Sequence, residues 1–83
     1  MKSFKLIVST PNGNALEKEI IMLSVRGTEG SLAVMAGHIP FITTTKAGEV
    51  KVKTQTDEKI YKASEGVLTV TKENATLLCT TFE

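Results

Sequence analysis

The stretch Gly27-Thr-Glu-Gly-Ser-Leu-Ala-Val-Met-Ala-Gly-His-Ile-Pro40 differs in composition from the sequence around it. It holds three of the six glycines, the single histidine and one of the two prolines. Glycine frees the backbone and proline restricts it, whereas Leu32, Val34 and Ile39 are large apolar residues interleaved among them. This composition is unlike that of a flexible linker. It predicts a segment that turns sharply, enters the core briefly and turns out again.

Short β-rich runs lie on both sides of this stretch. The run 49–53 alternates, with Val50 and Val52 on one face and lysines on the other. Turn-forming residues separate such runs at intervals of about 8–12 residues, which is typical of a sandwich or barrel. The sequence therefore predicts an all-β fold, a flattened β-sandwich or barrel of about ten short strands. Outside the ambiguous segment described next, we expect strands at residues 4–9, 41–45, 49–53, 59–63, 67–71 and 75–80.

Residues 14–26 fit two interpretations. Leu16, Ile20 and Leu23 have the spacing of one helix face. The run 20–25 is also rich in branched and long apolar residues, which suits a strand buried on both faces. Periodicity does not decide between them. We expect two strands here, because the neighbouring segments are strands.

Length and composition predict one small domain that folds without disulfides. The chain has 83 residues and a formal net charge of +1, which gives no strong field for nucleic acid or anionic lipid. Cys79 is the only cysteine, so no internal disulfide can form, and we expect it to be a small buried apolar residue. No apolar run approaches the roughly 18–20 residues that a membrane-spanning helix needs.

One pattern in the central stretch resembles a known family. The residues that carry it are Gly27, Glu29, Gly30, Leu32, Gly37, His38 and Pro40. They are similar to a loop of the epsilon subunit of F-type ATP synthases, a small accessory subunit of the rotary motor's central stalk. Ala33 and Ala36 depart from the usual Gly and Pro of that loop. Comparable elements recur along the chain, at residues 47–48, 66–70 and 76–78.

The resemblance implies that residues 1–83 form the N-terminal β-sandwich domain of such a subunit, with the C-terminal helical domain absent. It implies a non-catalytic connector between the gamma subunit and the ring of c subunits, through which proton-driven rotation is coupled to ATP synthesis. The chain would lie on the cytoplasmic side of the cell membrane, held there by the complex without inserting into the lipid. Isolated, it would be a monomer.

The resemblance also implies two sets of contact residues. Residues that meet the polar loops of the c-ring would be Thr28, Glu29, Gly30 and Ser31. Residues that meet the gamma subunit would be Val34, Met35, His38 and Ile42. Val34 and Ile42 fit plain core packing equally well.

No catalytic residues, metal site or cofactor site are expected. His38 is the sole imidazole, and one histidine with one distant cysteine is too few for a metal site. Two other functions of small all-β domains fit the sequence less well. A lipoyl- or biotinyl-type carrier would modify Lys46, but the flanking residues of that motif are missing. A barrel that binds single-stranded nucleic acid would need aromatic residues within a basic groove, and the aromatic residues here are scattered.

Overall fold

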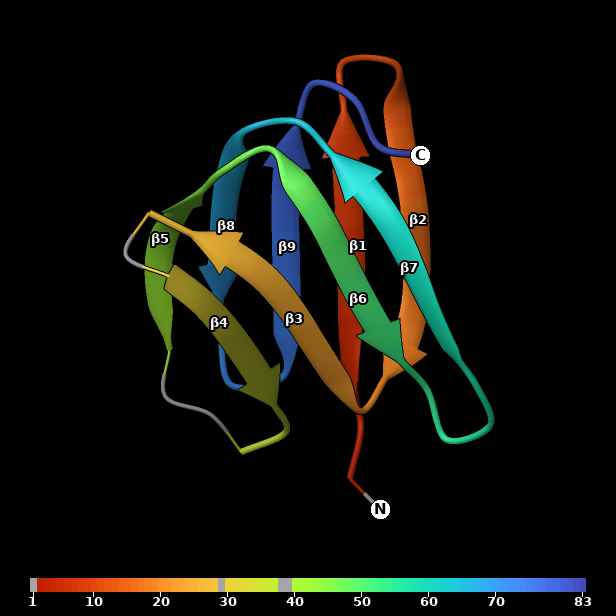
Figure 1. Cartoon of the computed structure of the whole chain (residues 1–83). Helices are drawn as coiled ribbons and strands as arrows, with labels where there is room; N and C mark the ends of the chain where they lie inside the picture. Colours follow the sequence, from red (N-terminus) through yellow and green to blue (C-terminus); the bar gives the residue numbers. More distant parts are fainter. Residues whose placement is uncertain (1, 29, 38–39) are drawn as a thin grey trace.

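The computed structural model describes residues 2–28, 30–37 and 40–83, and within them it contains nine β-strands and no helix (Figure 1). The two strands expected in residues 14–26 are both present. The strands are β1 (Phe4–Thr10), β2 (Gly13–Ile20), β3 (Met22–Gly27), β4 (Gly30–Met35), β5 (Phe41–Thr45), β6 (Gly48–Lys53), β7 (Glu58–Ala63), β8 (Gly66–Val70) and β9 (Asn74–Cys79).

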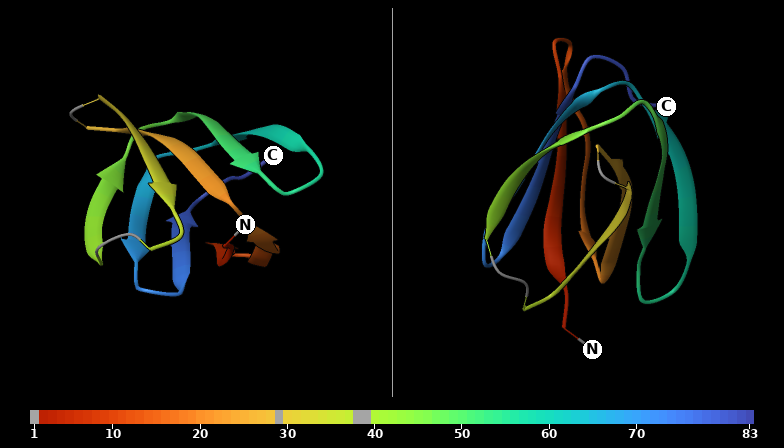
Figure 2. Two further views of the ribbon diagram at one scale, coloured as in Figure 1. Left: turned by 90° about the horizontal axis from the view of Figure 1, so that it is seen from below. Right: turned by 60° about the vertical axis from the view of Figure 1, so that its left-hand side comes forward.

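The strands form one mixed sheet that curls into two layers. The first layer has the order β2-β1-β9-β8-β5, and the second has β3 between β4 and β6, followed by β7. Figures 1 and 2 show the second layer crossing over the first. The layers join where Gly27 of β3 pairs with Thr45 of β5. We call them the first sheet and the second sheet, and the prediction of an all-β sandwich or barrel is confirmed.

Alternation along the strands builds the core between the two sheets. In β1, Phe4, Leu6 and Val8 are buried while the residues between them are half-buried. In β6, Val50 and Val52 are buried and the lysines are exposed, as the alternation predicted. The largest side chains with almost no exposure come from both sheets and are Leu6, Ile20, Leu23, Leu68, Leu77, Val8, Val34, Val52 and Val70.

The last residues of the chain close one side of the sandwich. After β9 the chain leaves the first sheet and runs beside β7, where Lys62 and Glu83 exchange both backbone hydrogen bonds at 2.9 and 2.8 Å. The hydroxyl of Ser64 accepts backbone N–H bonds from residues 80 and 81. The ring of Phe82 stacks on Tyr61 with centroids 4.9 Å apart. We call residues 80–83 the C-terminal clasp, because it ties the end of β9 to the second sheet.

Three expectations need correction or refinement. The central stretch was expected to be a turning connection, yet residues 30–35 form strand β4, because alternate residues there face the core. Segment 20–25 was expected to suit a strand buried on both faces, but β3 is buried on alternate residues only. The expected strand number was about ten; nine are found, together with an isolated bridge between Ala63 and Phe82 in the clasp.

Replacing Phe82 by alanine should destabilise the chain by about 2 kcal/mol, because a large, half-buried ring and its stacking on Tyr61 are lost. Ile60→Ala serves as the control, since Ile60 is 57% exposed on the neighbouring part of β7 and should cost less than about 0.5 kcal/mol. Urea unfolding followed by circular dichroism measures both. Equal losses in the two variants would show that the clasp does not hold the sheets together.

Candidate interaction surfaces

The hairpin between β3 and β4 presents the first set of predicted contact residues. Gly27 pairs with Gly30 at its end, and Gly30 has φ of +132°, a conformation that residues with a side chain rarely adopt. Thr28, Gly30 and Ser31 are exposed. Glu29 lies outside the described residues. The structure thus places three of the four predicted ring-contact residues together at the surface of one tight hairpin.

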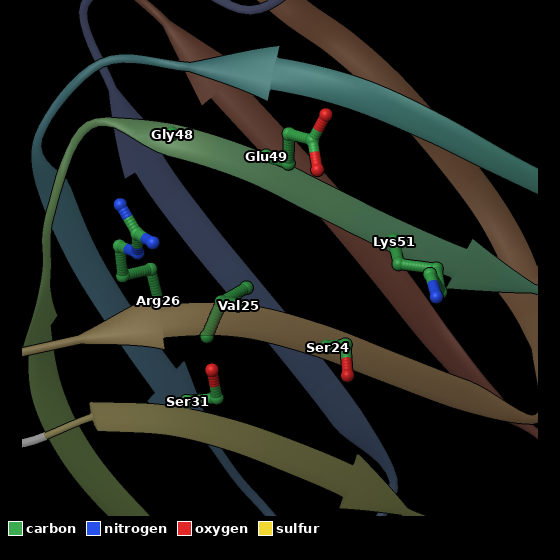
Figure 3. A pocket seen from close by; sticks show the side chains of 7 residues that line it. All are labelled: Ser24, Val25, Arg26, Ser31, Gly48, Glu49 and Lys51. Carbon is green, nitrogen blue, oxygen red and sulfur yellow. The ribbon is translucent and has the colours of Figure 1, made fainter.

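A shallow hollow of about 360 Å³ lies beside this hairpin on the outer face of the second sheet. Figure 3 shows the Arg26 side chain reaching from β3 toward Gly48, with the hydroxyl of Ser24 on the same strand and that of Ser31 on the adjacent strand β4. Arg26 is exposed and is the cross-strand partner of Ser31. The surface around Ser31 therefore carries a positive charge from β3. A signal for this charge is present in the sequence, because Arg26 directly precedes the central stretch.

The second predicted set, for the gamma subunit, is not brought together. Val34 is only 1% exposed and lies in the core, so it cannot be a surface contact, and that part of the prediction is wrong. Met35 is 58% exposed on the second sheet, where it pairs with Met22. Ile42 is 72% exposed on the first sheet. His38 lies outside the described residues.

The outer face of the first sheet has an uncharged area that the sequence analysis did not identify. Two rows of paired residues cross four strands, β5, β8, β9 and β1. One row is Ile42, Thr69, Thr76 and Ile7, and the other is Thr44, Val67, Leu78 and Ser9. We call these eight residues the apolar–threonine face. The signal for it was an apolar residue at the outward position of each strand.

The centre of this face is exposed and apolar, and no described part of the chain covers it. Val67 and Leu78 are direct cross-strand partners and are 37% and 49% exposed, next to Ile42. Isolated exposed apolar residues are common, but apolar residues that adjoin across several strands indicate an interaction site. Threonine hydroxyls between them can form hydrogen bonds with a partner.

Charged residues border the apolar–threonine face on β2 and at the start of β1. Lys5 of β1 and Glu17 of β2 form an exposed ion pair at 2.7 Å. The hydrogen bond that Lys5 donates to Glu17, together with the negative charge of Glu17, raises the pKa of Lys5. The same hydrogen bond and the positive charge of Lys5 lower the pKa of Glu17. Exposed pairs of this kind contribute little to stability. The pair therefore marks the polar rim of the face, as is common at interfaces.

The remaining candidate groups have structural positions. Cys79 is buried, as expected, and burial raises the pKa of its thiol, so it is a poor nucleophile. Phe4 is buried, while Phe41, Tyr61 and Phe82 are partly buried against the core, which leaves no exposed aromatic platform for bases. Lys46 lies between β5 and β6, and its backbone N–H donates to the carbonyl of Arg26.

The described residues contain neither a metal-binding cluster nor a helix that could span a membrane. No group of three or more His, Cys, Asp or Glu side chains gathers there to hold an ion. No helix in that part of the chain could cross a membrane. The arrangement offers exposed surfaces for binding and no cluster of reactive groups within the described ranges.

Comparison with known sequences gives one family. The family described as the beta-sandwich domain of the ATP synthase Delta/Epsilon chain matches residues 3–83. The sodium-ion-specific ATP synthase epsilon chain of Propionigenium modestum is 38% identical over 78 residues, which cover 94% of this chain and 57% of that protein. The ATP synthase epsilon chain of Bacillus subtilis is 32% identical over 83 residues, which cover 100% of this chain and 63% of that protein. The chain thus spans about three-fifths of each relative.

Solved structures agree on the fold. A chain of the mitochondrial ATP synthase of Euglena gracilis, in a structure of OSCP, F1 and the c-ring, superposes with a TM-score of 0.92 at 18% identity, covering 98% of this chain and 52% of that chain. A chain in a structure of the central stalk and c-ring of the Tetrahymena thermophila mitochondrial ATP synthase superposes with a TM-score of 0.83 at 11% identity, covering 99% of this chain and 66% of that chain. These similarities support the two-layer architecture.

Replacing Gly30 by alanine should destabilise the hairpin by about 1–3 kcal/mol. A Cβ at this position meets no other atom within 4 Å, so the cost comes from the φ of +132° and not from a clash. Ser31→Ala is the control, since Ser31 is an exposed residue without a positive φ and should change stability little. Thermal unfolding measures both variants. An unchanged melting temperature for Gly30→Ala would contradict the hairpin geometry.

Proposed function

We propose, because this chain belongs to the beta-sandwich family of ATP synthase delta/epsilon chains, that it is a non-catalytic part of the central stalk that links the gamma subunit to the c-ring. In this role it transmits proton-driven rotation of the ring to gamma and so supports ATP synthesis. It is peripheral to the membrane, on the cytoplasmic side, and is held there by the complex. Alone it is a monomer that corresponds to the N-terminal domain of the longer relatives.

The observation that carries this proposal is the apolar–threonine face of the first sheet. A connector needs a permanent contact with the part that it turns, and permanent contacts are more apolar than transient ones. Ile42, Val67 and Leu78 provide such a surface on adjacent strands, with charges at its rim. We assign this face to gamma. Of the residues expected there from the sequence, Ile42 remains in the proposed contact, while buried Val34 and Met35 on the second sheet do not.

The β3–β4 hairpin is the proposed contact with the polar loops of the ring. Thr28, Gly30 and Ser31 are exposed at its end, and Arg26 adds a charge beside Ser31. The hairpin and the apolar–threonine face belong to different sheets, which meet at Gly27 and Thr45. One rigid domain can therefore bind two partners at once. Rigidity matters here, because a flexible connector would lose torque.

The substitution Leu78→Lys tests whether the apolar–threonine face binds the gamma subunit. A lysine in the middle of the face would be desolvated in the complex without a partner, so the affinity for isolated gamma should fall at least about tenfold. Ile60→Lys is the matched control, because Ile60 is an equally exposed strand residue on the second sheet. The affinity of the Ile60→Lys variant for gamma should stay within about twofold of that of the parent chain. Both variants should keep the parent melting temperature within a few degrees, since both side chains are at the surface.

Calorimetric titration of gamma into each variant distinguishes the outcomes. Loss of binding by Ile60→Lys but not by Leu78→Lys would move the gamma contact to the second sheet. No binding by the parent chain would remove the proposed link to gamma altogether.

A further inference from the structure

The sandwich has four strand edges, β2 and β5 in the first sheet and β4 and β7 in the second, and those of β2 and β7 are protected against pairing with other chains. Strand β2 carries Glu17, Lys18 and Glu19. Strand β7 carries charged residues, and the C-terminal clasp pairs with part of its edge. Charged side chains and covering segments are the usual means of blocking an exposed edge. Strand β4, Gly-Ser-Leu-Ala-Val-Met, carries no charge, and among the described strands it pairs with β3 alone.

Hydrogen bonding in β3 shows which groups of β4 face this open edge. The carbonyl of Arg26 accepts a bond from the N–H of Lys46, so the backbone of Arg26 points away from β4. Directions alternate along a strand, so Gly27 and Val25 point toward β4 and bond to Gly30 and Leu32. The backbone groups of Ser31 and Ala33 therefore point out of the sheet. No hydrogen bond to these groups is found within the described part of the chain.

The neighbouring strand leaves room beside this edge. Strand β5 pairs with β3 only at Gly27 and Thr45, and from there β4 and β5 diverge (Figure 1). A hollow of about 200 Å³ lies at this divergence, lined by Ser31 and Leu32 of β4 and Thr43 of β5. Ser31 and Ala33 are both exposed. The edge is therefore accessible as well as unprotected.

The geometry points to strand addition at this edge: an extended segment of the gamma subunit pairs with β4 through the backbone groups of Ser31 and Ala33. This inference rests on the proposed function and adds the mode of binding. The edge adjoins both proposed interfaces, since Ser31 belongs to the ring hairpin and β5 carries Ile42 of the apolar–threonine face. A partner that covers Ile42 needs only to pass around β5 to reach β4.

An extended segment fits this edge better than a helix does. Backbone groups in a row are satisfied by another extended backbone, and side chains in strand addition give selectivity through alternate positions. The outward groups belong to Ser31 and Ala33, whose small side chains let another strand approach. The chain itself uses the same type of pairing where the clasp adds to β7.

Amide hydrogen exchange measured by NMR on the full chain tests this inference, with the chain free and bound to gamma. In the free chain the amides of Ser31 and Ala33 should exchange at least about tenfold faster than the amide of Leu32, which is bonded to β3. Leu32 is thus an internal control on the same strand. In the complex, all three should exchange slowly.

Ala33→Pro provides a second readout. Proline removes the outward N–H of residue 33 and leaves the bonds between β4 and β3 in place, as proline does on edge strands. The affinity for gamma should fall at least about tenfold, and by clearly less in Ala33→Ser, which keeps the N–H. If Ala33→Pro does not fold, the exchange measurement on the unmodified chain still decides.

Each outcome has one meaning. Tight binding of gamma with fast exchange at Ser31 and Ala33 would overturn strand addition and leave the gamma contact intact. Protection of both amides that rises with chain concentration in the absence of gamma would show that a second copy occupies the edge, which also overturns the inference. Absence of gamma binding would overturn this inference together with the proposed link to gamma.

Discussion

The two layers of this chain depend on the backbone of Gly27. Gly27 pairs with Gly30 on one side and with Thr45 on the other, so the second sheet and the first sheet continue into each other at this residue. A Cβ at Gly27 would lie 3.1 Å from the carbonyl oxygen of Gly30, closer than most such contacts. Thr45, opposite Gly27, is buried. The junction thus favours a residue without a side chain, and both the ring hairpin and the opening between β4 and β5 begin there.

The C-terminal clasp closes the sandwich on the side away from Gly27 and stiffens the domain. The clasp ties the end of β9 to β7, and the core fills the space between the sheets with aliphatic side chains from both layers. The sandwich is therefore closed at one side by the clasp and joined at the other by Gly27. Its two proposed interfaces then keep a constant relation to each other. A body of this kind transmits rotation better than a single helix or a linker of the same length.

Most of the fold could be predicted from the sequence, because alternation and turn residues are local signals. Val50 and Val52 were assigned to the core correctly, and the strand boundaries were close. Strand β4 was missed, because Gly30 at its start and Gly37 after its end resemble the glycines of a connection. Its pairing with β3 depends on the Gly27–Gly30 turn.

The surfaces were harder to predict. The apolar–threonine face is formed by residues from four strands, and their adjacency depends on strand order and register, including the parallel pairing of β1 with β9. Val34 was included among the gamma contacts because the resemblance indicates which segment meets gamma, but not which of its side chains point outward. In the structure it points into the core, one position before exposed Met35.

The central claim is that gamma, this chain and the c-ring turn as one rigid body. It is tested most directly by locking the chain to both partners in the assembled ATP synthase. Leu78→Cys would be cross-linked to a cysteine in gamma and Ser31→Cys to a cysteine in the polar loop of the ring, while native Cys79 stays protected by burial. The account predicts that proton-driven ATP synthesis continues after both cross-links have formed. Complete loss of synthesis on cross-linking would show that the chain moves relative to one of the two partners and would contradict it.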